Sequence, residues 1–443
     1  CSSDLMNTNN NSIKIVVHSD GPIINKDSTE SIIKNINNMR ESVEALREEN
    51  INLERIRDQY MIHLQQCQED HGRLRQIYKK LKLKYDLGTR NYPEIISQNQ
   101  QPPNLLSMQM QPTPLPLQFI HIIPQIQSLS KNFPASNIKL RKAINIGSII
   151  CSIQFTYDGT KFAFADGCFA YILDSETIEI ISTIQLPPLK DPNNRSKRVL
   201  SFSPNGKLLA LSGSDCTMLL YDVETKRLLN TFSGHTKDIH SILFSSNGEW
   251  VITGGYDSVI NIWNTQNFEQ IKHIIHNSES EQNEEAIVKI DAPPPESAFY
   301  AVGFLNGKVT LYNETFERTN IFSAHEDSNL LNIAVSPLDD TVATVGGDNA
   351  IKIWFVRGVA SLKHTLKGHQ DFPVAVSFSS KERLIFTGSK DHTIRIWEYK
   401  TGESLCLINA HHETVFSIAH HPKKRSFISS DGEGIICIWD YNY

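Results

Sequence analysis

The stretch that decides the fold runs from Gly234 to Trp263 and reads GHTKDIHSILFSSNGEWVITGGYDSVINIW. Turn residues separate its apolar runs, with Asn247-Gly248 after the first run and Gly254-Gly255 after the second. The three apolar runs are Ile239–Phe244, Trp250–Thr253 and Val259–Trp263. Short apolar runs joined by Asn-Gly or Gly-rich turns are typical of antiparallel β-hairpins. The stretch therefore predicts a small β-meander.

The same pattern recurs along the chain. When the copies are aligned on the aromatic residue that closes the third strand, it falls at Tyr171, Tyr221, Trp263, Tyr312, Trp354, Trp397 and Trp439. The spacing between these aromatics is 42 to 50 residues. A repeat of about 40–45 residues with Gly-His near its start and Trp near its end resembles the WD-repeat signature. We therefore expect an all-β, seven-bladed propeller.

Polar residues recur inside several copies at nearly fixed spacing. The His-to-Asp step is 22 or 23 residues, as in His235/Asp257, His325/Asp348 and His369/Asp391. We expect a hydrogen-bonded chain of His, Asp, Thr and Trp in each such blade, made of His235, Thr253, Asp257 and Trp263 in one and His369, Thr387, Asp391 and Trp397 in another. A His-Asp-Thr set also invites a hydrolase interpretation. Because the set recurs from blade to blade, a structural network that rigidifies each blade is favoured.

Several copies depart from this pattern. The copy ending at Tyr171 lacks both His and Asp, and the copy ending at Tyr221 keeps Asp215 without a Gly-His pair. In the copy ending at Tyr312, Asn306 stands where Asp is expected. In the last copy, Glu433 stands there.

Composition excludes several classes of protein. The chain has 443 residues, a net charge of −6 and a pI of about 6.3, so no overall basic field points to direct DNA binding. Seven scattered cysteines without a C-x-x-C pair disfavour a zinc site or a disulfide framework and favour a reducing compartment. No apolar run reaches the roughly 18 residues of a membrane span, and no signal peptide is visible. The first residue is Cys1, which fits a trimmed chain better than a lipid-anchored one.

No motif in the sequence indicates catalysis. There is no phosphate-binding glycine loop, no cluster of metal ligands and no solitary nucleophile with a matching base. We therefore expect no catalytic residue, no cofactor and no metal site. The expected role is that of a non-enzymatic scaffold.

The first 135 residues divide into three segments. Residues 1–26 read as a disordered tail and 27–87 as a coiled-coil helix, while 88–135, with eight of the nineteen prolines, reads as a Gln/Pro-rich linker. The apolar patch Phe119–Ile126 in the linker is either a docking motif or without function. The expected oligomerisation seam is Ile36, Met39, Val43, Leu46, Asn50, Leu53, Tyr60, Leu64, Leu74 and Leu81. Apolar residues beside the seam widen the stripe, which favours more than two helices.

Residues 136–443 are expected to form the propeller. The chain ends just after a third strand, whereas Ile138–Ile146 is a lone strand candidate before the first copy. We expect Ile138–Ile146 to serve as the outer strand of the last blade and so to close the ring.

One face of the propeller collects side chains typical of a partner interface. On this top face, the third and fifth residues after each His and the residue before each turn Asp point outward. The resulting partner-binding set is Ile149, Cys151, Ser196, Arg198, Asp238, His240, Tyr256, Ile287, Lys289, Asn329, Leu331, Phe372, Val374, Lys390, Thr414 and Phe416. Exposed aromatic and aliphatic residues gathered on one surface usually mark an interface.

The arrangement of coiled coil, Gln/Pro linker and seven-bladed propeller resembles the Tup/Groucho-type transcriptional corepressors. The stretches GHTKDIHSILF, SFSPNGKLLALSG, GHQDFPVAVSF and TGSKDHTIRIWEYKTGESL look closest to the fungal Tup branch. The resemblance implies a nuclear homo-tetramer whose propeller binds DNA-bound repressor proteins, with histone tails and deacetylases as further partners. It implies neither a membrane nor sequence-specific DNA contact.

Two other functions stay open. One is a cytoplasmic assembly or trafficking adaptor that uses the same propeller and coiled coil. The other is a substrate receptor of a ubiquitin ligase, which the lack of an F-box-like or RING cysteine pattern in residues 1–135 disfavours. Localisation separates a nuclear corepressor from a cytoplasmic adaptor.

Overall fold

The chain divides into two units, residues 1–108 and 109–443. The computed structural model describes residues 117–187, 198–213, 215–276, 285–293 and 299–443, all in the second unit. The expected tail, coiled coil and most of the linker lie outside the described residues, so those expectations stay predictions. No helix within the described ranges is both long and apolar enough to cross a membrane.

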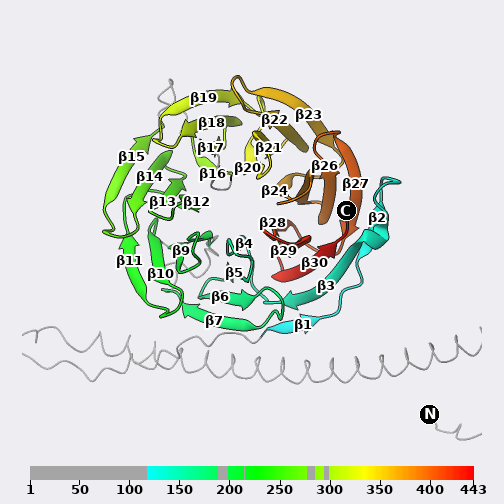
Figure 1. Ribbon diagram of the computed structural model, residues 1–443, viewed down its shortest axis with the longest axis horizontal. Helices are drawn as coiled ribbons and strands as arrows, with labels where there is room; N and C mark the ends of the chain where they lie inside the picture. Colours follow the sequence, from blue (N-terminus) through cyan, green and yellow to red (C-terminus); the bar gives the residue numbers. More distant parts are fainter. Residues whose placement is uncertain (1–116, 188–197, 214, 277–284, 294–298) are drawn as a thin grey trace, which may run out of the picture. The chain divides into compact units, whose positions relative to one another are not determined.

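The described part is a seven-bladed, all-β propeller, as the repeat predicted (Figure 1). Each blade is one antiparallel sheet, and in each of the first five blades four consecutive strands run from the centre of the ring outward. The first three blades are β4 (Ile153–Phe155), β5 (Lys161–Ala165), β6 (Phe169–Asp174), β7 (Ile180–Gln185); β8 (Leu200–Phe202), β9 (Leu208–Ser212), β10 (Met218–Asp222), β11 (Leu228–Phe232); and β12 (Ile239–Phe244), β13 (Trp250–Gly255), β14 (Val259–Asn264), β15 (Gln270–Ile275).

The remaining blades repeat this order. Blades four to six are β16 (Ile287–Asp291), β17 (Phe299–Phe304), β18 (Lys308–Asn313), β19 (Arg318–Ser323); β20 (Leu330–Val335), β21 (Thr341–Gly346), β22 (Ala350–Phe355), β23 (Ser361–Lys367); and β24 (Pro373–Phe378), β25 (Leu384–Ser389), β26 (Thr393–Glu398), β27 (Glu403–Asn409). Blade seven contains β28 (Val415–His420), β29 (Ser426–Asp431) and β30 (Ile435–Tyr441). The one described helix is the 3₁₀ turn Ala135–Asn137.

The hydrophobic core lies between neighbouring blades. One cluster of buried side chains joins Ile172 of blade one to Leu209 and Tyr221 of blade two, and similar clusters follow around the ring. The middle strands are buried on both faces, which explains the nearly continuous apolar runs at β13 and β14. Burial on both faces selects such runs over strict alternation.

Polar side chains also bridge neighbouring inner strands. The Gln154 amide oxygen accepts from the Phe202 amide at 2.9 Å, and the Asp291 carboxylate accepts from the Val335 amide at 2.8 Å. Bridges of this kind cross six of the seven blade boundaries. They satisfy backbone groups at the ends of short inner strands, which would otherwise be costly to bury.

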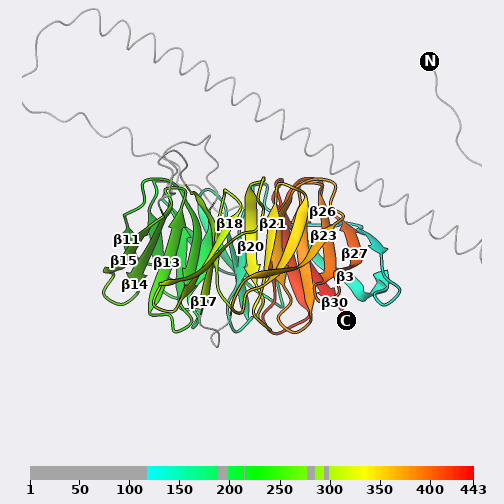
Figure 2. The same ribbon diagram turned by 90° about the horizontal axis from the view of Figure 1, so that it is seen from above.

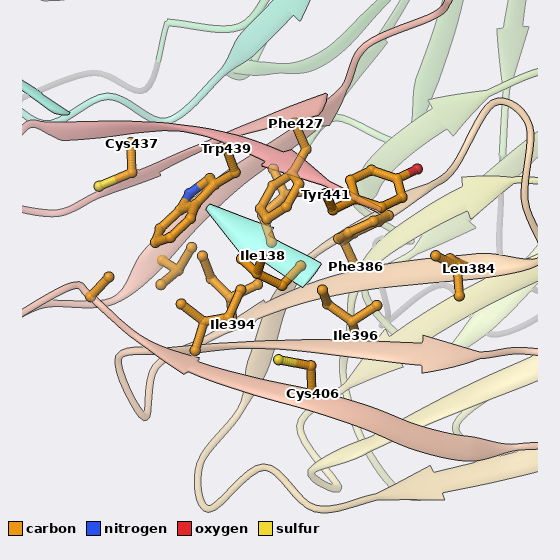
Figure 3. Packing of buried hydrophobic residues seen from close by; sticks show 14 of the residues in the cluster. Ile138, Leu384, Phe386, Ile394, Ile396, Cys406, Phe427, Cys437, Trp439 and Tyr441 are labelled. Atoms are coloured by element: carbon orange, nitrogen blue, oxygen red, sulfur yellow. The ribbon is translucent and has the colours of Figure 1, made fainter. Parts of the chain in front are cut away.

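The ring closes as predicted. Strand β3 (Ile138–Asn145) pairs antiparallel with β30, so blade seven combines the first strand after the linker with the last three strands of the chain. Ile138 lies beside Trp439 and Tyr441 in the buried cluster between blades six and seven (Figure 3). This pairing covers the outer edge of β30, which would otherwise be left unpaired in blade seven.

The segment expected to be a linker contributes two further strands. Strand β1 (Gln118–Ile120) pairs with β3, and β2 (Gln125–Ser128) pairs with β27, so the outer edges of blades seven and six are covered. The patch Phe119–Ile126 therefore belongs to the sheets. Phe133, which is fully buried, anchors the segment, and its ring centroid lies 6.0 Å from that of Tyr443.

Candidate functional site

The polar network of blade three forms an unbroken hydrogen-bonded chain. His235 Nδ1 lies 3.0 Å from the Asp257 carboxylate, and His235 Nε2 lies 2.8 Å from Thr253 Oγ1. The Trp263 indole nitrogen donates to the same Thr253 oxygen at 3.3 Å. The two imidazole nitrogens of His235 therefore bridge a carboxylate and a hydroxyl, and the indole completes the chain.

The same chain recurs in blades five and six. His369 Nδ1 donates to Asp391 at 2.9 Å, while Nε2 lies 2.8 Å from the Thr387 hydroxyl, which accepts from Trp397 at 2.9 Å. Burial lowers the pKa of His369 and, as the largest single effect, opposes ionisation of Asp391. The hydrogen bond and charge of His369, together with hydrogen bonds from Thr393 and the Gln370 amide, outweigh burial and lower the pKa of the Asp391 carboxyl. Each polar atom is engaged inside its blade, which leaves the set as a structural network.

The last blade corrects one prediction. Its network acid is Asp431, which binds His411 Nδ1 at 2.8 Å, and not Glu433, which is exposed. Asp431 pairs with Val415 as Gly255 pairs with Ile239, so it occupies the strand end instead of the turn. A Cβ atom at Gly255 would lie 2.6 Å from His235 Nδ1, which shows that a side chain at this position reaches the histidine directly.

The first blade corrects the alignment on aromatics. In five blades a β-bulge lies just before the closing aromatic, as between Ile262 and Trp263, whereas in β6 it lies between Ile172 and Leu173. Leu173 is therefore the closing residue. Tyr171 is fully buried and stacks on Phe164 with ring centroids 5.2 Å apart.

Blade four replaces the network with other contacts. Asn306 donates to the buried carboxylate of Glu285 at 3.0 Å, and Lys308 donates to the same oxygen at 3.2 Å. The closing residue Tyr312 hydrogen-bonds to His276. These partners lie on both sides of residues 277–284, so repeat spacing alone could not pair them.

The top face surrounds one end of a central cavity of about 740 Å³. Figure 2 shows the strands crossing the thickness of the ring, so that the connections gather on two opposite faces. The top face carries the connections from each outer strand to the next blade and the turns between second and third strands. Seven of the top-face side chains that line the cavity are here named the collar, namely Cys151, His240, Tyr256, Val288, Leu331, Val374 and Phe416.

The collar is mainly apolar and partly preorganised. The His240 and Tyr256 rings stack with centroids 3.6 Å apart and an interplanar angle of 9°. Outside the collar, Phe372 is 38% exposed, and the Lys390 ammonium lies 5.3 Å from its ring centroid. Aromatic rings that are fixed by stacking or by a cation–π contact offer rigid contact area to a partner.

Other members of the predicted set lie around this collar. Asp238 and Asn329 are exposed, whereas Ile149 and Thr414 are half-buried. Lys390 is exposed and pairs with Asp371 at 3.4 Å. Ser196 lies outside the described residues.

Blade four departs from the predicted set by a shift of one residue. Ile287 is fully buried in the core, and Val288 occupies the position that His240 has in blade three. A one-residue shift in a strand turns the side chain to the opposite face. Lys289 lines the cavity from the next position. Because Ile287 pairs with Phe304, the residues that follow them, Val288 and Leu305, take the places of His240 and Tyr256 in blade three. Both line the cavity, and the predicted set did not include them.

Arg198 is also wrong as an exposed contact residue. It is 3% exposed, and its guanidinium donates to the carbonyl oxygens of Ser212, Gly167 and Pro187 at 2.8 to 3.3 Å. Blades one and two lack the His–Asp network, and this buried guanidinium ties their turns together instead.

Comparison with known families agrees with this architecture. The family model described as "WD domain, G-beta repeat" matches residues 194–222, 226–264, 316–354, 360–398 and 402–440. The chain is a WD-repeat protein. The matches leave out blade one and residues 265–315, which include the inner strands of blade four, where the structure lacks the His–Asp network.

Relatives of this WD-repeat protein are similar at modest identity. Apoptotic protease-activating factor 1 of Danio rerio is 24% identical over 311 residues, or 70% of this chain and 23% of that protein. The LST8 homolog of Drosophila melanogaster is 28% identical over 222 residues, or 47% of this chain and 68% of that protein. Pre-mRNA-processing factor 17 of Homo sapiens is 24% identical over 288 residues, or 54% of this chain and 49% of that protein. The chain thus spans less than a quarter of the first relative and about half of the third.

Proposed function

We propose that this chain is a non-enzymatic scaffold that binds partner proteins on the top face of its propeller and acts as a transcriptional corepressor. The observation that supports binding is the collar, where apolar and aromatic side chains from six blades surround the mouth of one cavity. An apolar patch rimmed by polar residues is typical of protein interfaces. In this proposal, DNA-bound repressors occupy the collar.

The corepressor role rests on the resemblance to Tup/Groucho proteins and not on the relatives named above, whose names do not single out that branch. Nuclear localisation, oligomerisation through residues 27–87, and recruitment of histone tails and deacetylases are parts of the same proposal. Under the alternative proposal, a cytoplasmic assembly adaptor uses the same collar for other partners.

Affinity capture from nuclear extract tests the proposal. The bait is the full chain, compared with a Tyr256→Ala/Phe372→Ala/Phe416→Ala variant. A matched control carries Ile181→Ala/Leu229→Ala/Ile271→Ala on the outer strands, where these side chains are 41–48% exposed. We expect sequence-specific DNA-binding proteins with the wild type and the control. We expect their loss with the triple variant, which changes two collar residues and the neighbouring Phe372.

Two outcomes contradict parts of this proposal. Recovery of coat or signalling proteins without chromatin components would rule out the corepressor role and favour an adaptor. Equal recovery of all partners by the triple variant and the control would show that the collar is not the binding site. Circular dichroism of the three baits checks that each variant is folded.

A further inference from the structure

In the described top-face connections, exposed carboxylates outnumber exposed lysines around the collar. Its exposed carboxylates include Asp238 before β12, Glu326 and Asp327 before β20, Glu413 before β28, and Glu433 after β29. Exposed lysines in the described top-face connections are Lys237 and Lys390. The imbalance is local, because the chain as a whole has a net charge of only −6 over 443 residues.

These carboxylates are available to a partner. In the described part of the chain, no lysine, arginine or histidine nitrogen lies within 4.0 Å of the Glu326, Asp327 or Glu413 carboxylates. By contrast, the network acids Asp391 and Asp431 are engaged by histidines inside the blades. Glu326, Asp327 and Glu413 therefore contribute charge to the surface without a described cation within 4.0 Å to balance it.

Two of the acids lie directly beside collar aromatics. The Tyr256 backbone amide donates to the Asp238 carbonyl oxygen at 3.0 Å, so Asp238 adjoins the His240–Tyr256 stack. A Cβ atom at Gly432 would lie 3.2 Å from the Phe416 ring and 3.5 Å from the Glu413 Cβ. Negative charge thus borders the apolar surface on two sides of the cavity mouth.

We propose that the top face binds an extended peptide segment in which apolar side chains are flanked by lysines or arginines. The apolar side chains contact the collar, and the flanking cations face the surrounding carboxylates. This inference rests on the proposed function, because it uses the same collar. Nucleic acids and anionic lipid surfaces are disfavoured on this face, because their phosphates would meet the same carboxylates.

Binding of three synthetic peptides to the purified full chain tests this inference. The peptides share one Phe/Leu core and carry lysines, serines or glutamates on both flanks, and fluorescence anisotropy measures each dissociation constant. We expect the order lysine, serine, glutamate from tightest to weakest. We also expect the lysine peptide to lose its advantage when the ionic strength rises to about 0.5 M, where surface charges are strongly screened.

Charge reversal on the protein locates the effect. The variant Asp238→Lys/Glu413→Lys should weaken binding of the lysine peptide about tenfold, since each surface pair accounts for a factor of a few. The control Glu224→Lys/Glu314→Lys changes net charge equally on the opposite face and should leave binding unchanged. Both control residues are exposed, in the turns after β10 and β18.

The outcomes separate this inference from the proposed function. Equal affinity for the three peptides, lost on Phe416→Ala, would overturn the charge preference while supporting the collar as a binding site. Equal weakening by the two charge-reversal variants would also overturn it. If none of the peptides binds the wild-type chain, both the inference and the collar are contradicted.

Discussion

At the residue scale, the buried polar networks show which parts of a repeat can be derived from spacing. The sets at His235 and His369 were predicted from their repeated spacing, and the structure contains both hydrogen-bonded chains. Asp431 was missed because it enters from the strand end, where other blades have Gly255, Gly346 or Ser389. An acidic residue where the other three blades have glycine or serine was the sequence feature that could have identified Asp431.

Asp431 and Glu433 make a matched test of this assignment. We expect Asp431→Asn to reduce the free energy of unfolding by about 1–3 kcal/mol, because it leaves the buried His411 without its charged acceptor. Glu433→Gln should change it by less than about 0.5 kcal/mol, since the side chain is exposed. Urea unfolding followed by tryptophan fluorescence measures both. A larger effect for Glu433→Gln would contradict the assignment.

A second residue-scale prediction concerns pH. Burial against Phe386 and Tyr441 lowers the pKa of His420 to about 4 and outweighs two opposing effects, a backbone hydrogen bond with His421 and the nearby Glu382 carboxylate. Because the unfolded histidine titrates near about 6.5, the unfolded state binds more protons between these values, so stability falls as pH decreases from about 6.5 to about 4.

Replacement of His420 should flatten this pH dependence. His420→Gln removes one titrating group, so the loss of unfolding free energy between pH of about 7 and about 4 should shrink by on the order of 2 kcal/mol. The variant His121→Gln, at an exposed histidine between β1 and β2, serves as control. An identical pH dependence in wild type and His420→Gln would contradict the prediction.

At the element scale, closure of the ring by β3 was predictable from the sequence, whereas the added edge strands β1 and β2 were not. Ile138–Ile146 stood out as an apolar run without a blade of its own, and the structure pairs it with β30. Strands β1 and β2 are only three and four residues long and lie among prolines and glutamines. Such short edge strands are specified by their pairing partners more than by their own sequence. In blade four, Ile290 pairs with Val302, 12 residues further on, whereas the equivalent pair in blade three, Ile242 and Thr253, is 11 residues apart. This one extra residue between β16 and β17 shifts the register inferred from the closing aromatic.

The anchor of this segment gives an element-scale prediction. Phe133 is fully buried in the cluster that contains Ile138, Trp439 and Tyr441. Phe133→Ala should therefore lower the free energy of unfolding by about 3 kcal/mol, as is usual for a buried phenylalanine. Phe119→Ala in β1, at a side chain that is 54% exposed, should cost less than about 1 kcal/mol. Equal costs in denaturant titrations would show that Phe133 does not anchor the segment.

At the scale of the whole molecule, the repeat count predicts the propeller because seven copies specify one ring. The coiled coil lies outside the described residues and stays a prediction of the heptad pattern. We expect the full chain to form tetramers in sedimentation equilibrium. Leu46→Glu/Leu53→Glu/Leu74→Glu should yield monomers with an unchanged β-sheet circular dichroism signal, because charges at seam positions prevent helix association. Tetramers of this variant would contradict the assigned seam.

The central claim is that partner proteins bind at the collar. Photocrosslinking from a benzophenone amino acid, placed in turn at Phe372, Phe416, Leu229 and Ile271 of the full chain, tests it most directly. We predict that a bound partner crosslinks strongly from the two top-face positions and weakly from the two outer-strand positions. Strong crosslinks from the outer strands with none from Phe372 or Phe416 would contradict the claim.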